Sequence, residues 1–306
     1  MTRDVGRYLV IGEALIDIVA RHAEDPVEHV GGSPANVAVG VARLDNQVTF
    51  ATSLGEDARG DRIREHLSRR GLTVHSGAGD DPTSTALATI DEGGAATYTF
   101  DISWDPGPVA LEPQTGHIHT GSIAAVLEPG ATDVLATLAA GRPQATISYD
   151  PNFRPGIMGD PEAAMTKIEA VIGVADVVKA SSDDLLEMYP GSSIEEVLQR
   201  WLDLGAALAV VTRAEDGVTY RTASFEPVTL PAPPTTVVDT VGAGDSFMAG
   251  LISGLAAAHL LGGPEARERL RAAGADDVTP AIERGGRCGA ITVSRAGAYA
   301  PSLDEL

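Results

Sequence analysis

Cysteine and lysine are nearly absent from this sequence of 306 residues. Cys288 is the only cysteine, so a single chain can form neither a disulfide nor a cysteine zinc site. Lysine occurs only at Lys167 and Lys179, and neither follows a glycine-rich loop, so the pattern G-x-x-x-x-G-K-[ST] is missing. The sequence therefore excludes disulfide scaffolds, cysteine zinc modules and P-loop nucleotide-binding proteins.

Aromatic residues and positive charges are also scarce. Aromatic side chains make up 4% of the chain, and 43 acidic residues outnumber 22 basic ones, for a formal net charge of -21. Few rings are available to stack on bases, and a negative field repels phosphate backbones. Nucleic acid is therefore excluded as a partner, and any phosphate site has to be built by local groups.

Long apolar runs are missing too. No segment approaches the ~20 apolar residues that cross a bilayer. The N-terminal stretch MTRDVGRYLVIGEALIDIVA does not resemble a signal peptide, because Glu13 and Asp17 interrupt its apolar run. Together with the single cysteine, these absences predict a cytoplasmic protein without a membrane partner.

Strand-like and helix-like segments alternate along most of the chain. An apolar segment at 7–20 is interpreted as one strand that continues outward, and buried strands are expected at about 47–55, 116–123, 145–152, 174–181 and 206–217. Helical patterns are found at about 33–44, 57–71, 129–140, 161–171, 183–189 and 193–204. This alternation predicts an α/β fold with a mostly parallel sheet and helices on both faces.

Residues 84–103 interrupt the alternation. Two alternating runs flank Gly93-Gly94, which predicts a β-hairpin, and residues 16–30 alternate weakly as well. We interpret the segments at about 16–31 and 84–104 as a small separate sheet. Such a sheet beside a ligand crevice typically acts as a lid, and the alternative is a surface decoration without function.

The stretch 237–255, VVDTVGAGDSFMAGLISGL, places a carboxylate at the expected start of an apolar helix, at about Gly244. Glycines let the backbone approach a ligand closely, and free N–H groups at a helix N-terminus bind anions. In phosphoryl transfer, an aspartate beside such an anion hole accepts the proton of the attacking hydroxyl. Asp245 is therefore the candidate base, and Gly242, Ala243 and Gly244 form the candidate anion hole. Plain helix capping by Asp245 is the structural alternative.

Two stretches resemble the two signatures of the ribokinase-like (PfkB) sugar kinases. DTVGAGDSFMAGL at 239–251 is similar to the C-terminal signature, and GGSPANVAVGVARL at 31–44 is similar to the N-terminal one. They occur in the family's order, and the resemblance covers nearly the whole chain. It implies a single ribokinase-like domain over 1–306, a Rossmann-like sheet with a β-lid, and ATP-dependent phosphorylation of a sugar hydroxyl.

The resemblance also implies a sugar site. The family's sugar-binding positions are matched by Asp17, at the end of the expected first strand, and by Gly31, Gly32 and Asn36. Arg154 lies in a stretch that resembles the D-P-N-x-R segment of fructokinase-like members, and its forked donors suit a sugar or phosphate oxygen. The structural alternatives are a solvated strand end for Asp17, a turn before a helix for Gly31, Gly32 and Asn36, and a surface arginine for Arg154.

For the nucleotide, the resemblance points to Ser181, Asp184, Thr212 and Gly217. Ser181 and Asp184 stand where the family often has N-x-x-E, a motif that holds magnesium through waters. Capping of a helix by Ser181 or Ser182 before Asp184 is the alternative. Thr212 and Gly217 match the T-x-G-x-x-G element near the ATP phosphates, but Ala214 replaces one glycine and reduces backbone freedom there.

Two candidate metal sites differ in origin. The resemblance implies that Asp239, the Val241 carbonyl and Gly297 frame a monovalent cation such as K⁺. His117 and His119 lie two residues apart on one side of an expected strand, where structural packing is favoured over metal binding.

The hairpin, SWDPG at 103–107 and DPNFRP at 150–155 resemble fructokinases most. This likeness implies fructose as the acceptor, ATP and Mg²⁺ as cofactors, and sugar contacts from Tyr98 or Phe100. A 2-keto-3-deoxygluconate kinase and a catalytically silent sugar-binding regulator stay open as alternatives. A nicotinamide dehydrogenase is disfavoured, because Phe247 replaces the third glycine of G-x-G-x-x-G. The lid sheet is expected to pair between subunits of a homodimer.

Overall fold

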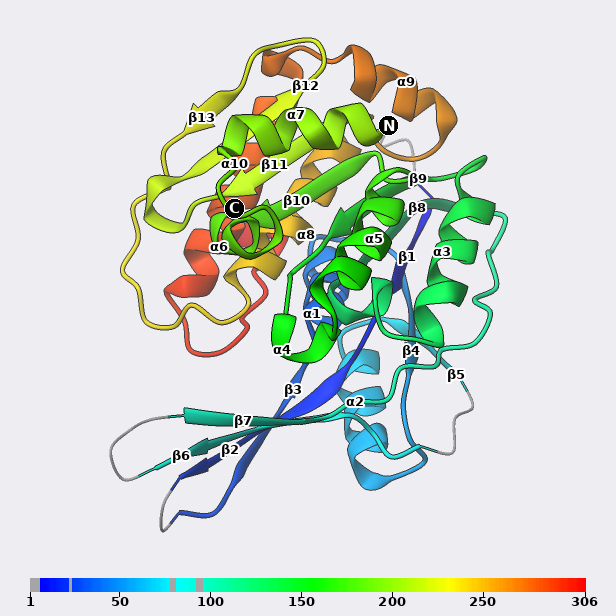
Figure 1. The fold of residues 1–306 in the computed structure, drawn as a ribbon, viewed down its shortest axis with the longest axis vertical. Helices are drawn as coiled ribbons and strands as arrows, with labels where there is room; N and C mark the ends of the chain where they lie inside the picture. The colour runs from blue at the N-terminus through cyan, green and yellow to red at the C-terminus, as the bar shows by residue number, and fades with distance from the viewer. Residues whose placement is uncertain (1–5, 22–23, 78–80, 92–95) are drawn as a thin grey trace.

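A nine-stranded sheet forms the centre of the part that the computed structural model describes, residues 6–21, 24–77, 81–91 and 96–306 (Figure 1). Its order is β13-β12-β11-β10-β9-β8-β1-β4-β5. The strands are β1 (Arg7–Ile11), β4 (Val48–Ser53), β5 (Thr73–Gly77), β8 (Thr115–Gly121), β9 (Thr146–Asp150), β10 (Val177–Ser181), β11 (Leu208–Thr212), β12 (Val218–Thr222) and β13 (Val228–Leu230). The strands from β11 to β5 pair in parallel, and β12 and β13 join antiparallel. The expected mostly parallel sheet is therefore confirmed.

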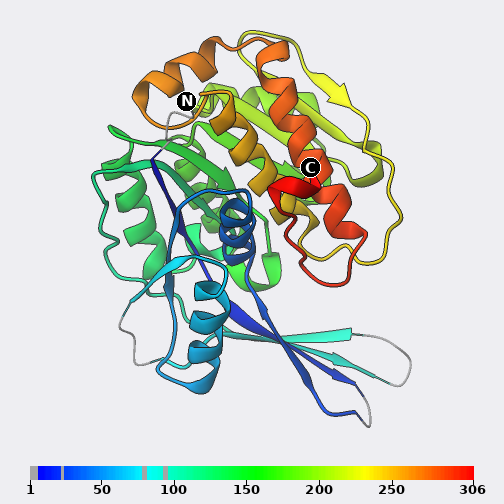
Figure 2. The same cartoon turned by 180° about the vertical axis from the view of Figure 1, so that it is seen from behind.

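Helices cover both faces of this sheet, which explains why its central strands are apolar on both sides. They are α1 (Ser33–Arg43), α2 (Ala58–Ser68), α3 (Gly130–Gly141), α4 (Pro155–Met158), α5 (Pro161–Ile172), α6 (Ser182–Met188), α7 (Ile194–Leu204), α8 (Ala243–Ala257), α9 (Pro264–Ala272) and α10 (Ala275–Val293). One core lies under α3, α5, α6 and α7, and the other lies under α1, α2, α8, α9 and α10 (Figures 1 and 2). Within the described residues, no helix is both long and apolar enough to span a bilayer.

A second, four-stranded sheet projects from this body (Figure 1). Its order is β3-β2-β6-β7, with strands β2 (Leu15–Arg21), β3 (Val27–Gly31), β6 (Thr85–Ile90) and β7 (Ala96–Asp101). β6 and β7 pair antiparallel, as the hairpin pattern predicts, while the expected Gly93-Gly94 turn lies outside the described residues. Segments from two distant parts of the chain therefore build one small sheet.

The expectation of a single strand over 7–20 is wrong. β1 ends at Ile11, and β2 begins at Leu15 in the other sheet, so Asp17 lies inside the small sheet and not at the end of the first strand. A Cβ atom at Gly12 would lie 2.2 Å from the Pro34 side chain, so the chain leaves β1 in close contact with α1. The apolar pattern continues across this break, and the sequence therefore does not reveal it.

Close packing of α1 on α8 brings two distant parts of the chain together. Gly40 of α1 faces α8, and a Cβ atom there would lie 2.6 Å from the Cβ of Ala249. Two methyl groups cannot approach that closely, so only glycine at this position allows the observed helix separation.

We predict that Gly40→Ala lowers the free energy of unfolding by about 1–3 kcal/mol, because the added methyl group forces the two helices apart. Denaturant unfolding measures this change. Gly156→Ala is the matched control, because a Cβ atom there meets no atom within 4 Å. Equal stability of the two variants would show that α1 and α8 tolerate a wider separation.

Candidate functional site

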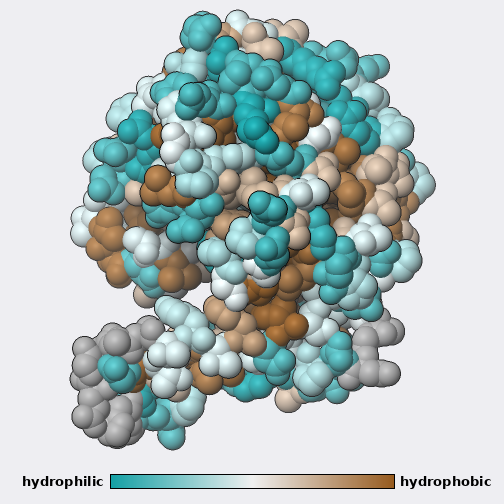
Figure 3. Space-filling view, viewed as in Figure 1, coloured by the Kyte–Doolittle hydropathy of each residue, from teal (hydrophilic) through white to brown (hydrophobic). Residues whose placement is uncertain are grey.

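A cleft opens between the small sheet and the edge of the large sheet where its parallel strands end (Figure 3). It is lined by the residues that the sequence nominates for catalysis, sugar, nucleotide and monovalent cation, but not by His117 or His119: Asp17, Gly31, Gly32, Asn36, Arg154, Ser181, Asp184, Thr212, Gly217, Asp239, Val241, Gly242, Ala243, Gly244, Asp245 and Gly297. The glycine turn thus faces the same crevice as Asp17 and Asn36. The fold brings the nominated residues together, although they are spread over most of the chain.

The turn before α8 has the geometry that its glycines predict. Gly242 adopts a left-handed backbone conformation with φ of 75°, and a Cβ atom there would lie 2.7 Å from that of Ala298. The Ala243 N–H donates to the Thr240 carbonyl at 3.3 Å, and α8 begins at Ala243, one residue earlier than expected. The start of α8 lines the cleft, but the Ala243 N–H is already used within the turn, so the anion hole stays a prediction.

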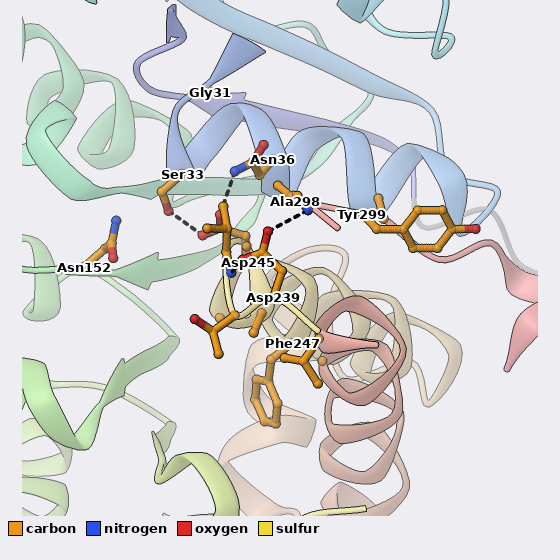
Figure 4. A pocket seen from close by; sticks show the side chains of 18 of the residues that line it. Gly31, Ser33, Asn36, Asn152, Asp239, Asp245, Phe247, Ala298 and Tyr299 are labelled. Atoms are coloured by element: carbon orange, nitrogen blue, oxygen red, sulfur yellow. Dashed lines mark hydrogen bonds between the residues drawn. The ribbon is translucent and has the colours of Figure 1, made fainter. Parts of the chain in front are cut away.

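The Asp245 carboxylate is bound by two side chains of α1 (Figure 4). Ser33 Oγ donates to Oδ1 at 2.7 Å, and Asn36 Nδ2 donates to Oδ2 at 2.9 Å. The N-cap of α8 is Gly242, which has no side chain, and Asp245 lies in the first turn of the helix, where an acidic residue is favoured, so both interpretations of Asp245 stay open. Sequence reasoning missed Ser33 as a partner, because only the packing of α1 on α8 brings it there.

Burial raises the pKa of Asp245, and the donors Asn36 and Ser33, followed by the charge of Lys179, oppose this rise. A general base works best when its pKa approaches the operating pH. Asp245 therefore combines a raised proton affinity with an orientation that two hydrogen bonds fix.

Lys179 adds a buried positive charge directly behind the turn. Its Nζ lies 2.8 Å from Asp150 Oδ2, and a Cβ atom at Gly244 would lie 3.0 Å from it. Burial alone would lower the pKa of Lys179, but the Asp150 carboxylate raises it above its ordinary value. A fixed cation thus stands beside the candidate anion hole in a strongly acidic chain. The sequence signal was a lysine within the apolar strand VVKAS.

Ser181 and Asp184 form a capping box at the start of α6, which is the structural alternative to a role in nucleotide binding. The Ser181 side chain accepts from the Asp184 N–H, and Asp184 Oδ2 accepts from the Ser181 N–H in return. Asp184 Oδ1 accepts from the Phe153 N–H at 2.9 Å. The side chain of Arg154 is 51% exposed and donates to the Phe153 carbonyl and to Asn152 Oδ1. A role of these residues toward a nucleotide or a sugar stays a prediction.

The segment after β11 requires unusual backbone geometry. Gly217 has φ of 91°, and a Cβ atom there would lie 2.0 Å from the Leu230 carbonyl oxygen, so only glycine fits. Ala214 adopts φ of 47°, a left-handed conformation that glycine adopts more easily. The turn therefore forms although Ala214 replaces a glycine of the T-x-G-x-x-G pattern. Thr212 Oγ1 lies at the end of β11, 3.4 Å from the Ala180 carbonyl oxygen.

Asp239 links the turn to the C-terminal segment. Its Oδ1 accepts from the Val241 N–H at 3.0 Å, and its Oδ2 accepts from the Gly297 N–H at 2.8 Å. These backbone donors lower the pKa of Asp239, which keeps it ionised. The three residues nominated for a monovalent cation are therefore adjacent, although the described residues contain no cluster of three or more His, Cys, Asp or Glu side chains suited to a metal ion.

His117 and His119 are packed inside the sheet, as expected. Both rings contact the Ser148 hydroxyl, at 2.8 Å and 2.9 Å, and His117 also contacts Thr146. Burial lowers the pKa of each to about 3, so both are neutral.

Residues 6–305 match the family described as pfkB family carbohydrate kinase. The chain belongs to this family. A fructokinase of Klebsiella pneumoniae is 30% identical over 98% of each chain, and one of Salmonella typhimurium is 33% identical over 81% of this chain and 84% of its own. The pfkB fold and a phosphotransferase activity with a sugar hydroxyl as acceptor are therefore confirmed.

Solved structures are similar over almost the whole chain. A fructokinase from Xylella fastidiosa with bound ATP has a TM-score of 0.83 at 26% identity, covering 98% of this chain and 96% of that one. A Vibrio cholerae fructokinase with fructose, ADP and potassium ion has a TM-score of 0.81 at 26% identity, covering 98% and 97%. The ribokinase-like fold with fructokinase-like features is thereby confirmed.

We predict that Ser33→Ala moves the acidic limb of the kcat–pH profile for sugar phosphorylation to higher pH. If Asp245 is the general base, activity needs its ionised form and falls as the pH drops through its pKa. Loss of a donor to the ionised form raises that pKa further. Steady-state kinetics at saturating sugar measure the limb. Thr166→Ala is the control, because Thr166 donates to the Glu162 carbonyl on the exposed side of α5. An unchanged limb would exclude Asp245 as the titrating base.

Proposed function

We propose that the protein transfers the γ-phosphate of ATP to the primary hydroxyl of D-fructose, giving fructose 6-phosphate. The observation that carries this proposal is the pairing of Asp245 with the glycine turn inside one cleft. The names of the similar proteins support it, since they include fructokinases, and their structures contain fructose and ATP.

Asp245 would act as the general base. It accepts the proton of the sugar hydroxyl while Ser33 and Asn36 hold its two oxygens in place. The N–H groups at the start of α8 bind the charge that develops on the transferred phosphoryl group, and Lys179 adds a positive charge from behind. Because all three groups are fixed before the reaction, little reorganisation accompanies the charge movement.

Asp17, Gly31, Gly32 and Arg154 would surround the sugar with Asn36. A Cβ atom at Gly31 would lie 1.9 Å from Asp17 Oδ2, so only glycine allows this carboxylate to face the cleft. We propose that the small sheet acts as the lid of a single domain over 1–306. Tyr98 and Phe100 stack at 6.2 Å on its cleft side and would cover the sugar.

The cofactor positions follow the remaining lining residues. ATP would lie along Thr212 and Gly217. The oxygens of Ser181 and Asp184 are already used in the helix cap, which suits Mg²⁺ held through waters and substrate phosphates. Bound Mg²⁺ would neutralise charge on the phosphates. Asp239, the Val241 carbonyl and the segment at Gly297 would hold K⁺, since Asp239 supplies a fixed negative charge there.

An ADP-release assay with ATP and Mg²⁺ tests the proposal on D-fructose, D-ribose, 2-keto-3-deoxygluconate and further sugars. We expect the highest turnover with D-fructose, and a loss of at least about 100-fold in kcat for Asp245→Asn, because the base is removed. Asp160→Asn is the matched control, since Asp160 caps α5 away from the cleft and asparagine caps equally well.

Each other outcome has a defined meaning. Preference for the keto acid would make the protein a 2-keto-3-deoxygluconate kinase. Sugar binding without turnover of any acceptor would indicate a catalytically silent sugar-binding regulator. Wild-type rates in Asp245→Asn would remove Asp245 as the base. The proposed dimer through the small sheet is tested separately, by light scattering of the full chain.

A further inference from the structure

Glu13 carries a buried carboxyl group that the proposed reaction does not use. It lies between β1 and β2, is only 5% exposed and lines the cleft. Its Oε2 atom is buried and has no hydrogen-bond partner. Of the described residues that line the cleft, Glu13 alone has a buried side-chain oxygen in this state. Leaving such an atom unpaired costs stability, so it points to a partner that arrives with a ligand.

The backbone around Glu13 is held in place from two sides. Gly32 adopts φ of 107°, and a Cβ atom there would lie 2.5 Å from the Glu13 carbonyl oxygen. Ser122, which follows β8 and lines the same part of the cleft, adopts φ of 55°. A left-handed conformation is uncommon for a residue other than glycine and is typical of functional sites. The Glu13 backbone is therefore closely packed against Gly32, next to a second residue of unusual conformation.

The neutral form of Glu13 predominates at neutral pH. Burial is the main cause that raises its pKa to about 8, and the charge of Asp245 acts in the same direction, while the Ser122 side chain and Arg154 lower it. A protonated carboxyl group has both a donor and an acceptor, which suits a sugar hydroxyl. It also adds no negative charge beside Asp245 and the transferred phosphate.

We propose that Glu13 is a sugar-binding residue that acts in its neutral form, with Oε2 hydrogen-bonded to a hydroxyl that is not phosphorylated. This inference rests on the proposed sugar kinase activity. Asp245 activates the reacting hydroxyl, so a second polar group at a different point of the same cleft fixes the orientation of the sugar. Binding of the sugar also gives Oε2 the partner that it lacks.

The first experiment compares Glu13→Gln with Glu13→Leu. Glutamine keeps an uncharged side chain with a donor and an acceptor, whereas leucine removes both. Calorimetric titration without ATP and steady-state kinetics would use D-fructose, or the panel sugar with the highest turnover. We expect Glu13→Gln to keep the Kd and KM of the wild type for the sugar. Glu13→Leu should raise both constants about tenfold, and neither variant should change the KM for ATP.

Thermal unfolding separates this role from a structural one. Thr52→Val is the matched control, because Thr52 Oγ1 is also buried without a partner but lies outside the cleft. We expect Glu13→Leu and Thr52→Val to leave the Tm unchanged or raise it, and only the former to change the sugar Kd. Wild-type sugar affinity in Glu13→Leu would overturn the proposal.

The pH dependence tests the neutral form. As the pH rises through the pKa of Glu13 near 8, the carboxyl group ionises, so the sugar KM of the wild type should increase at alkaline pH. Glu13→Gln has no such group, and its KM should stay level over the same range. Equal loss of affinity in the glutamine and leucine variants would show that the ionised form binds, and would refute the neutral one. Absence of any wild-type turnover would instead count against the kinase proposal.

Discussion

The two hydrogen bonds that Ser33 and Asn36 donate to Asp245 join the halves of this molecule at its reactive centre. They connect residues more than 200 positions apart, at separations of 212 and 209. Their geometry depends on the close approach of α1 to α8, which Gly40 permits. Because both helices start at the cleft, one packing contact aligns the segment proposed to bind the sugar with the turn proposed to bind the phosphate.

The cleft concentrates acidic groups in a chain that is already strongly negative, and local contacts compensate for this. Asp245 is oriented by neutral donors, Asp150 lies behind the lining and is paired with Lys179, and the raised pKa of Glu13 favours its neutral form. Burial raises the pKa of Asp150 to about 6, and Lys179 opposes that rise. The negative charge of each of the three carboxyl groups is thus reduced or offset in a different way. A phosphate therefore meets less electrostatic repulsion when it enters the cleft.

Local sequence patterns predict the parts of this structure that depend on local physics. The glycine turn, the start of α8 and the β6–β7 hairpin follow from glycine positions and side-chain periodicity, and the two signatures predict the family. Asp17 was placed on the wrong strand, because the apolar pattern does not register a change of sheet. Ser33 and Lys179 were missed because their partners, Asp245 and Asp150, are distant in the sequence and only tertiary packing brings them within hydrogen-bonding distance. Glu13 was missed because the burial of its side chain also depends on tertiary packing.

The two walls of the cleft differ in chemistry, and this difference suits a sugar. Glu13 and Asp245 provide polar atoms at the base, whereas Tyr98 and Phe100 on the small sheet are 62% and 40% exposed and stack in parallel. Exposed aromatic side chains beside a cleft are typical of a binding surface. A sugar presents hydroxyls around its ring and C–H groups on its faces. The base can therefore select the pattern of hydroxyls, while the aromatic pair covers an apolar face and excludes water, which would otherwise compete for the phosphate.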